Sequence, residues 1–234
     1  MYIARYGELL RAHDISWKFK FTKELKPMGL FIMQAFTNPV FYAQAVVVTI
    51  LSICLHELGH GFAALSQGDD TPSRSGHITM NPLVHMGTPS LIFLFVTGIA
   101  WGQMPVNPSR FRSRQWGDFL VSIAGPLTNL ALTALFVVAL QARLPFLKPD
   151  FLLYGAIINA SLFLLNMIPI PPLDGFHVFS KFFPNLQFFN SAQGQQYAQG
   201  LLMVLFIVGG KFLTDGAFII VRWMMGLLGG FRGF

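Results

Sequence analysis

Long apolar stretches separated by short polar segments dominate the pattern along the chain. A helix needs about 20 apolar residues to cross the core of a bilayer. Three stretches meet or approach that length: 41–66, 117–141 and 151–168. A fourth, 197–228, is interrupted by glycines and charged residues, which predicts one further span and a short or interfacial helix. The pattern therefore predicts an all-α, polytopic membrane protein with about four to six membrane segments.

Two shorter apolar stretches are not long enough to span. Residues 28–37 end at Asn38-Pro39, a pair that favours the start of the next helix. Residues 89–103 reach only about three-quarters of a span, so we expect a re-entrant or partly inserted segment there. Residues 73–88 show an alternation typical of a short strand or hairpin. Together these features predict a short re-entrant, strand-like segment beside the functional site.

The polar pattern divides the chain into two parts. Residues 1–37 are predicted to form a basic N-terminal tail and an interfacial segment, and residues 38–234 a single membrane-embedded domain. The first apolar stretch begins about 28 residues into the chain and lacks a small-residue cleavage site. We therefore expect no removable signal peptide.

The composition supports a membrane protein. Hydrophobic residues make up 53% of the 234 residues and charged residues only 11%, whereas a soluble domain carries about 25% charged residues. A soluble globular domain and a disordered chain are therefore excluded. The single cysteine, Cys54, excludes an intrachain disulfide and a zinc site built from several cysteines.

The net charge of +6 is unevenly distributed along the chain. Six of the 16 Lys and Arg residues lie within the first 26 residues, and three more lie in the arginine loop, residues 110–114. Such clusters are typical of topology signals and lipid-headgroup contacts. No DNA-binding motif accompanies them, so no nucleic-acid partner is expected.

The same charges predict an orientation in the membrane. The positive-inside rule predicts that the arginine loop is cytoplasmic. If 89–103 is re-entrant, the end of the 41–66 helix lies on that side too, and a site near that end faces the cytoplasm. The basic tail also favours the inside, which requires 28–37 to form a hairpin with the following helix.

One cluster of ionisable residues lies inside the most apolar helix. Glu57 stands between His56 and His60 in the sequence HELGH. Ionisable residues in a membrane helix are costly and indicate function, so a chance match to HExxH is disfavoured here. Residues four apart share a helix face, so both imidazoles can bind one metal ion, while Glu57 beside them can take a proton from the attacking water. Zinc suits two imidazoles and a carboxylate with one open position.

A third ligand must come from outside this helix, and Asp174 is one possibility. Pro169, Pro171 and Pro172 prevent a continuous helix before it and leave it free to turn back toward the membrane site. The spacing fits a solvated Asp-Gly turn equally well. Asp69 and Asp70 are nearer in sequence, but either would need a tight fold-back. The other histidines of the domain, His77, His85 and His177, are expected to make structural hydrogen bonds or lie in loops.

Three motifs in order resemble the site-2 protease family of intramembrane zinc metalloproteases. They are HELGH at 56–60, GPLTN at 125–129 and NMIPIPPLDG at 166–175. Residues 76–83 and 105–108 are similar to the small, single-domain bacterial branch of that family. The resemblance covers roughly residues 38–180. It implies one zinc ion on His56, His60 and Asp174 and Glu57 as the general base. Asn166 and Asn129 would lie near the site and place substrate or stabilise the oxyanion.

The resemblance also implies a function. It predicts an integral, multi-pass protein of the cell membrane that hydrolyses a peptide bond in or near the transmembrane segment of a membrane-protein substrate. Its partners would be that substrate and the lipid bilayer, and the sequence indicates no oligomeric state. For Asn129, a role in packing helices together is an equal alternative.

Three other functions stay open at this point. A metal transporter needs several sites along a path, and the sequence offers one cluster. A non-proteolytic zinc-binding membrane protein usually lacks a catalytic residue, and none is missing here. A membrane protease of another HExxH family usually takes a Glu as its third ligand, and no Glu follows Glu57.

Overall fold

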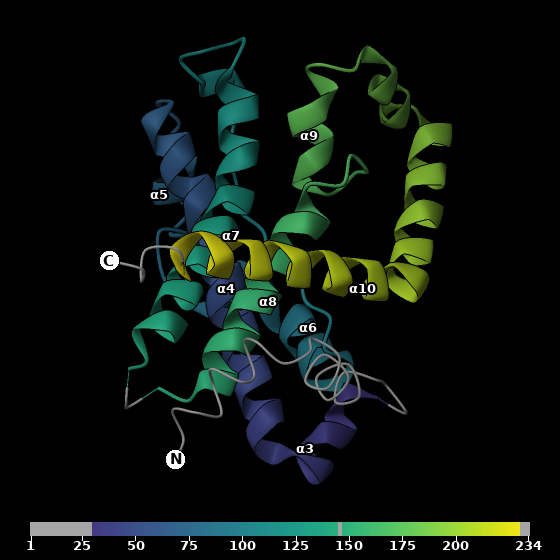
Figure 1. Ribbon diagram of the computed structural model, residues 1–234. Helices are drawn as coiled ribbons and strands as arrows, with labels where there is room; N and C mark the ends of the chain where they lie inside the picture. The colour runs from purple at the N-terminus through teal and green to yellow at the C-terminus, as the bar shows by residue number, and fades with distance from the viewer. Residues whose placement is uncertain (1–29, 145–146, 230–234) are drawn as a thin grey trace.

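The computed structural model describes residues 30–144 and 147–229, and every regular element within them is a helix (Figure 1). The predicted all-α fold is thus confirmed for this part of the chain, whereas most of the predicted basic tail lies outside it. In chain order the elements are η1 (Phe31–Met33), α3 (Gln34–Thr37), α4 (Pro39–Ser66), α5 (Thr71–Arg74), α6 (Pro82–Thr97), η2 (Pro108–Arg110), α7 (Gly117–Ala142), α8 (Pro149–Asn166), α9 (Asp174–Ser180), η3 (Pro184–Asn190) and α10 (Ala192–Gly229).

Three of these helices, α4, α7 and α8, are long and apolar enough to cross a membrane. Helix α10 bends by 65° between Phe206 and Val208, and its two parts together give a fourth candidate span. Its second part crosses α7 and α8, against which it packs (Figure 1). The described residues therefore hold three spans, or four if the two parts of α10 count as one, and the higher count reaches the low end of the predicted four to six.

Helix α4 carries the HELGH motif and has clear local causes for its ends. The side chain of Asn38 accepts a hydrogen bond from the N–H of Phe41, and Pro39 occupies the first turn, where a free N–H would have no helical partner. After the helix ends at Ser66, Gly68 adopts a φ of +91°, which only glycine tolerates without strain. The helix therefore begins two residues before the predicted range of 41–66 and ends where predicted.

Helix α7 packs against both α4 and α8 and so holds the spans together. At Gly59 of α4 an added Cβ would lie 3.0 Å from the carbonyl oxygen of Ala124, so glycine permits a close approach of α4 and α7. Large side chains such as Leu51 and Leu135 stay exposed on the spans, as suits lipid-facing positions. A core between α7, α8 and α10 contains Val137, Ala156, Ile157, Ala160, Ala217, Phe218 and Val221.

Helix α6 and the segment after it replace the predicted strand-like region. Helix α6 is apolar but shorter than a span, and it is kinked at Gly87, which adopts a φ of 67°. Residues 98–107, the return segment, then run back along α6. The hydroxyl of Ser90 bonds both backbone groups of Trp101, at 2.7 and 2.9 Å, and the N–H of Gln103 donates to the carbonyl of His85 at 2.9 Å.

The predicted short strand within 73–88 does not form. Residues 75–76 form a turn and residues 78–79 a bend, and a helix begins at Pro82. The side chain of Asn81 caps this helix by accepting from the N–H of Leu83. His85, one turn in, bonds the carbonyl of Thr79 through Nε2 at 2.6 Å, which keeps that carbonyl from pairing with a neighbouring strand. Local capping has therefore overridden the alternating pattern.

The arginine loop lies against the end of α4. The N–H of Arg112 donates to the carbonyl of Gln67 at 2.7 Å, and Arg110 forms an ion pair with Asp70. The end of the HELGH helix and the arginine loop therefore lie side by side.

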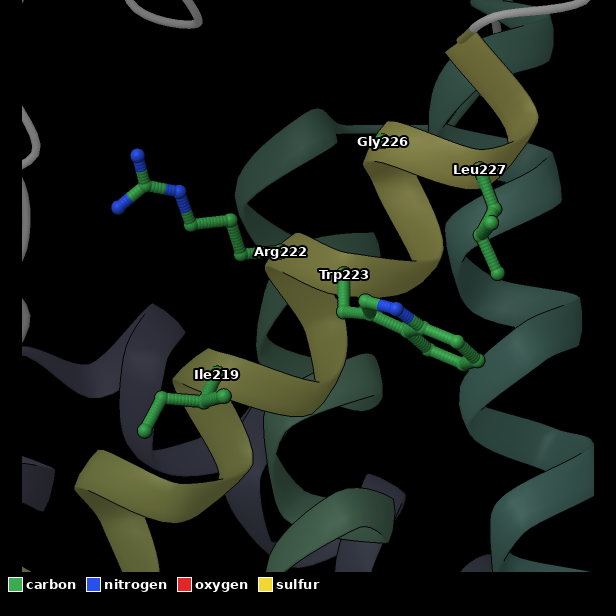
Figure 2. A pocket seen from close by; sticks show the side chains of 5 residues that line it. All are labelled: Ile219, Arg222, Trp223, Gly226 and Leu227. Carbon is green, nitrogen blue, oxygen red and sulfur yellow. The ribbon is translucent and has the colours of Figure 1, made fainter.

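A shallow hollow lies on the second part of α10 and is separate from the HELGH motif. Ile219, Arg222, Trp223, Gly226 and Leu227 line it, and all come from one helix (Figure 2). Arg222 and Trp223 point to opposite sides of the helix, so no polar groups converge there (Figure 2). This hollow is therefore not the functional site.

Candidate metal centre

Two histidines of α4 face each other inside the helical bundle. His56 and His60 are both buried and lie one turn apart, so their rings share a helix face. Their Nε2 atoms are 3.0 Å apart. The helical period alone therefore brings together two imidazole nitrogens that could bind one metal ion.

Asp174 completes the metal group, by which we mean His56, His60 and Asp174. The proline-containing turn after α8 ends where α9 begins, and Asp174 is the first residue of α9. Its Oδ2 lies 3.0 Å from Nε2 of His56 and 3.3 Å from Nε2 of His60. Within the described residues this is the one group of His, Cys, Asp and Glu side chains arranged to hold a metal ion.

The two aspartates that are nearer in sequence have other partners. Asp69 accepts hydrogen bonds from the backbone N–H groups of Thr71 and Asn107. Asp70 forms ion pairs with Arg74 and Arg110. Neither carboxylate belongs to the metal group, so the geometry favours Asp174 among the alternatives that the sequence left open.

The donor atoms of the metal group suit a cation. Nδ1 of His56 lies 2.6 Å from the side-chain oxygen of Asn129, and Nδ1 of His60 lies 2.7 Å from the carbonyl oxygen of Val121. Both oxygens only accept hydrogen bonds, so each neutral imidazole carries its proton on Nδ1 and a lone pair on Nε2. Two lone pairs and a carboxylate oxygen then converge and repel one another unless a cation lies between them.

The spacing of these atoms agrees with zinc. Bonds of about 2.0–2.1 Å to a tetrahedral zinc ion place neighbouring ligand atoms about 3.3 Å apart. The three distances in the metal group are 3.0, 3.0 and 3.3 Å. Gly125 of α7 leaves the space beside them open. A Cβ at this position would lie 2.6 Å from Nε2 of His56 and closer still to Nε2 of His60.

Glu57 lies beside the metal group and is not part of it. Its side chain is buried and meets the return segment at Gly102, where an added Cβ would lie 2.8 Å from the carboxyl carbon of Glu57. The glycine therefore allows the backbone of the return segment to pass directly over the carboxylate. This arrangement suits a base that acts on a group held between α4 and the return segment.

Two titratable groups near the site have shifted pKa values. Burial alone would raise the pKa of the Asp69 carboxyl, but hydrogen bonds from Asn107 and Thr71 hold it below its usual value. On α9, a hydrogen bond to the carboxylate of Asp118 raises the pKa of His177. The first interaction ties the end of α4 to the residues before η2, and the second ties α9 to the start of α7.

The two asparagines predicted to lie near the site have different surroundings. The side chain of Asn129 is fully buried and contacts His56 directly. The side chain of Asn166 is half-buried and donates to the carbonyl of Leu162 in its own helix, at 3.1 Å. The catalytic roles predicted for both residues stay predictions, and only Asn129 is held against the metal group by a hydrogen bond in this structure.

Two residues near the site were not singled out as functional from the sequence. Asn159 of α8 is fully buried and accepts a hydrogen bond from Asn129. Its signal was an amide in the middle of an apolar span, where polar side chains commonly bond a neighbouring helix. His85 was expected to be structural, and its bond to Thr79 agrees, although its Nδ1 is buried without a partner among the described residues.

Comparisons with known proteins place the chain among membrane peptidases. The sequence model of peptidase family M50 matches residues 44–146 and 147–209. The candidate zinc metalloprotease YwhC of Bacillus subtilis is 32% identical over 173 residues, which are 69% of this chain and 79% of that protein. The candidate zinc metalloprotease Rip2 of Mycobacterium tuberculosis (strain H37Rv) is 31% identical over 207 residues, 82% and 78% of the two chains.

A more distant relative comes from an archaeon. The candidate zinc metalloprotease MJ0611 of Methanocaldococcus jannaschii is 28% identical over 156 residues, which are 60% of this chain and 73% of that protein. No solved structure matches the chain at a significant level. The family match includes α4, α7, α8 and α9, and thus every residue of the metal group.

Proposed function

The chain belongs to peptidase family M50, and on that premise we propose that it is a membrane-embedded zinc metalloprotease. It hydrolyses a peptide bond in or near the transmembrane segment of a membrane-protein substrate. One observation supports this proposal above all. The HELGH motif lies on a candidate membrane span, and Oδ2 of Asp174 in α9 lies 3.0 Å from Nε2 of its His56. Hydrolytic machinery inside a span suits a substrate that is itself in the membrane.

His56, His60 and Asp174 would hold one zinc ion per chain. Bound there, zinc polarises the scissile carbonyl and makes a water molecule acidic enough to be activated at neutral pH. Glu57, buried beside the metal group, takes the proton of the attacking water and returns it to the leaving amine. Each task thus falls to a residue whose position suits it, with two ligands on one face of α4, the third at the start of α9, and the base one position away on α4.

The return segment is our candidate for binding the substrate backbone. Residues 101 and 103 bond inward to α6, while the backbone groups of 102 and 104 have no hydrogen-bond partner among the described residues. This alternation is typical of extended backbone with one free edge. A substrate that unwinds can pair with that edge as an added strand, directly over Glu57.

The asparagines have separate proposed roles. Asn129 orients His56 through the 2.6 Å hydrogen bond to Nδ1. Asn166 would turn its amide from Leu162 toward the substrate and stabilise the negative charge that develops on the carbonyl oxygen. We further propose that the site faces the cytoplasm, because the arginine loop borders the end of α4.

The proposal is tested by separating zinc binding from cleavage. Glu57→Gln changes no ligand, so zinc per chain should stay at the wild-type level. Cleavage of membrane-anchored reporters should fall about a hundred- to ten-thousand-fold, because the amide cannot accept the proton. His56→Ala and Asp174→Ala should lose zinc and activity together.

The controls decide between protease and metal-binding protein. Asp70→Ala removes an exposed carboxylate outside the metal group and should leave both zinc and cleavage unchanged. Full cleavage by Glu57→Gln would refute the mechanism. Zinc transport into vesicles at the same rate in wild type and Glu57→Gln, with no cleavage of any reporter, would favour a transporter.

A further inference from the structure

A relay of buried amides connects His56 to the backbone of α8. Nδ1 of His56 lies 2.6 Å from Oδ1 of Asn129, and Nδ2 of Asn129 donates to Oδ1 of Asn159 at 3.0 Å. Nδ2 of Asn159 in turn donates to the carbonyl oxygen of Gly155 at 2.9 Å. Asn129 and Asn159 are both fully buried. The relay therefore runs from α8 through α7 to α4 and links all three helices that qualify as spans on their own.

The relay has a direction, because its far end can only accept. The carbonyl of Gly155 has no proton, so the nitrogen end of the Asn159 side chain must face it and the oxygen end must face Asn129. That oxygen requires the nitrogen end of Asn129, which also lies 3.5 Å from the carbonyl oxygen of Ser52. Oδ1 of Asn129 is thereby turned toward His56. Each amide thus passes on the orientation that the previous one imposes.

We propose that Asn159 is a positioning residue that sets the tautomer of His56. With an accepting oxygen held against Nδ1, the imidazole keeps its proton on Nδ1 and presents a lone pair on Nε2 toward Asp174 and His60. This inference rests on His56 being a metal ligand, as proposed above. Groups that orient a ligand imidazole typically change metal affinity about ten- to a hundredfold when removed.

Simple packing between helices is the competing explanation. A buried asparagine in a membrane helix also holds neighbouring helices together, whatever it does for a ligand. The two roles make different demands on the side chain. Packing depends on volume and on contact between α7 and α8, whereas the relay depends on an acceptor that is itself anchored to the Gly155 carbonyl.

Two variants of nearly equal volume separate these roles. Asn159→Ala removes the acceptor, whereas Asn159→Ser keeps a hydroxyl that can donate to the carbonyl four residues earlier and accept from Asn129. Both leave a similar cavity. We expect the zinc dissociation constant, measured by chelator competition in detergent, to rise about tenfold in Asn159→Ala and to stay close to wild type in Asn159→Ser.

Two further measurements test the route of the effect. In an Asn129→Ala background, Asn159→Ala and Asn159→Ser should bind zinc equally, because the link to His56 is already cut. With Co²⁺ in place of zinc, the visible absorption spectrum should change in Asn159→Ala and not in Asn159→Ser. Thr133→Val is the matched control. The buried hydroxyl of Thr133 in α7 donates to the backbone carbonyl of Asn129 and forms no hydrogen bond with the side-chain amide of Asn129.

The outcomes distinguish this inference from the proposed function. Equal zinc affinity in wild type and Asn159→Ala, or an equal loss in the Ala and Ser variants, would overturn the relay and leave the protease proposal intact. Retention of zinc by His56→Ala would instead overturn the proposed ligand set. A loss in Thr133→Val as large as in Asn159→Ala would assign the effect to helix packing.

Discussion

At the scale of single residues, the space beside the metal group is left open by a residue with no side chain. Gly125 of α7 passes so close to His56 and His60 that any side chain would enter the space between their Nε2 atoms. Because α7 is held against α4 by close contact at Gly59, it cannot easily move away. The GPLTN motif thus supplies an empty position at Gly125 and an orienting amide at Asn129.

Gly125→Ala should therefore abolish zinc binding. The new methyl group would lie 2.6 Å from Nε2 of His56 and would occupy the space that a metal ion needs. We expect zinc per chain, measured by elemental analysis, to fall to background, and cleavage to be lost with it. Gly200→Ala, which meets no neighbouring atom, is the matched control and should retain both. Normal zinc content in Gly125→Ala would show that the ion binds elsewhere.

The residues of the site were predictable from the sequence to different degrees. The shared face of His56 and His60 follows from the helical period, because residues four apart meet without any knowledge of the rest of the fold, and Glu57 lies one position away. From spacing alone, Asp174 could be either a metal ligand or part of a solvated turn, because a turn after prolines can point toward the site or away from it. The structure places its Oδ2 3.0 Å from Nε2 of His56. Nδ2 of Asn129 donates to Oδ1 of Asn159 and, more weakly, to the carbonyl of Ser52, and no local pattern contains these contacts between helices.

At the scale of elements, the return segment brings the backbone of Gly102 close to the carboxyl group of Glu57. Ser90 and His85 of α6 hold residues 101 and 103, and this leaves Gly102 facing the carboxylate of Glu57. The hydropathy pattern predicted the long helices α4, α7 and α8 to within two residues, because burial in lipid acts along each one separately. It did not predict the course of the return segment, which is set by hydrogen bonds between residues ten or more positions apart.

Gly102→Ala should impair cleavage without removing zinc. A methyl group there would lie 2.8 Å from the carboxyl carbon of Glu57, so the return segment or the carboxylate must shift. Displacement of a reacting group by about 1 Å can cost about a hundredfold in rate. We expect a loss of that order in cleavage of a membrane-anchored reporter, with zinc per chain unchanged. Unaltered cleavage would show that the return segment does not position the base or the substrate.

Asp69 joins the end of α4 to the residues before η2, and its loss should destabilise the protein. Its carboxylate accepts from Asn107 at 2.6 Å and from Thr71 at 3.0 Å. In Asp69→Asn an amide nitrogen would meet one of these donors, which costs about 1–3 kcal/mol of unfolding free energy. Asp70→Asn loses only exposed ion pairs and should lower the unfolding free energy much less.

The pH dependence of this loss gives a further check. The pKa of Asp69 is lower in the folded chain than its unfolded value of about 3.9, so the folded state favours the carboxylate. Its contribution to stability is therefore complete above the unfolded pKa and is lost as the pH falls through the folded pKa. The difference in melting temperature between wild type and Asp69→Asn should narrow below about pH 4. A difference in melting temperature that does not change with pH would contradict this account.

At the scale of the whole molecule, the contacts place four cationic residues of the described part of the chain at one end of the helical bundle. Arg74 and Arg110 share Asp70, Arg112 bonds the end of α4, and Lys181 donates to the carbonyl of Gln115. The connection at the other end of α7 carries Arg143 and Lys148. The metal group lies toward the more basic end, because HELGH occupies the second half of α4.

This asymmetry predicts that the basic end, and with it the metal group, faces the cytoplasm. Gln115 and Ala142 are exposed residues next to opposite ends of α7, so a cysteine at each reports one side of the membrane. In a Cys54→Ala background, a membrane-impermeant maleimide should label Ala142→Cys in intact cells. It should label Gln115→Cys only after permeabilisation. If 28–37 forms the predicted hairpin, Ser16→Cys in the basic tail should behave like Gln115→Cys. Efficient labelling of Gln115→Cys from outside would reverse the orientation, and the substrate would then be cut on the outer side of the membrane.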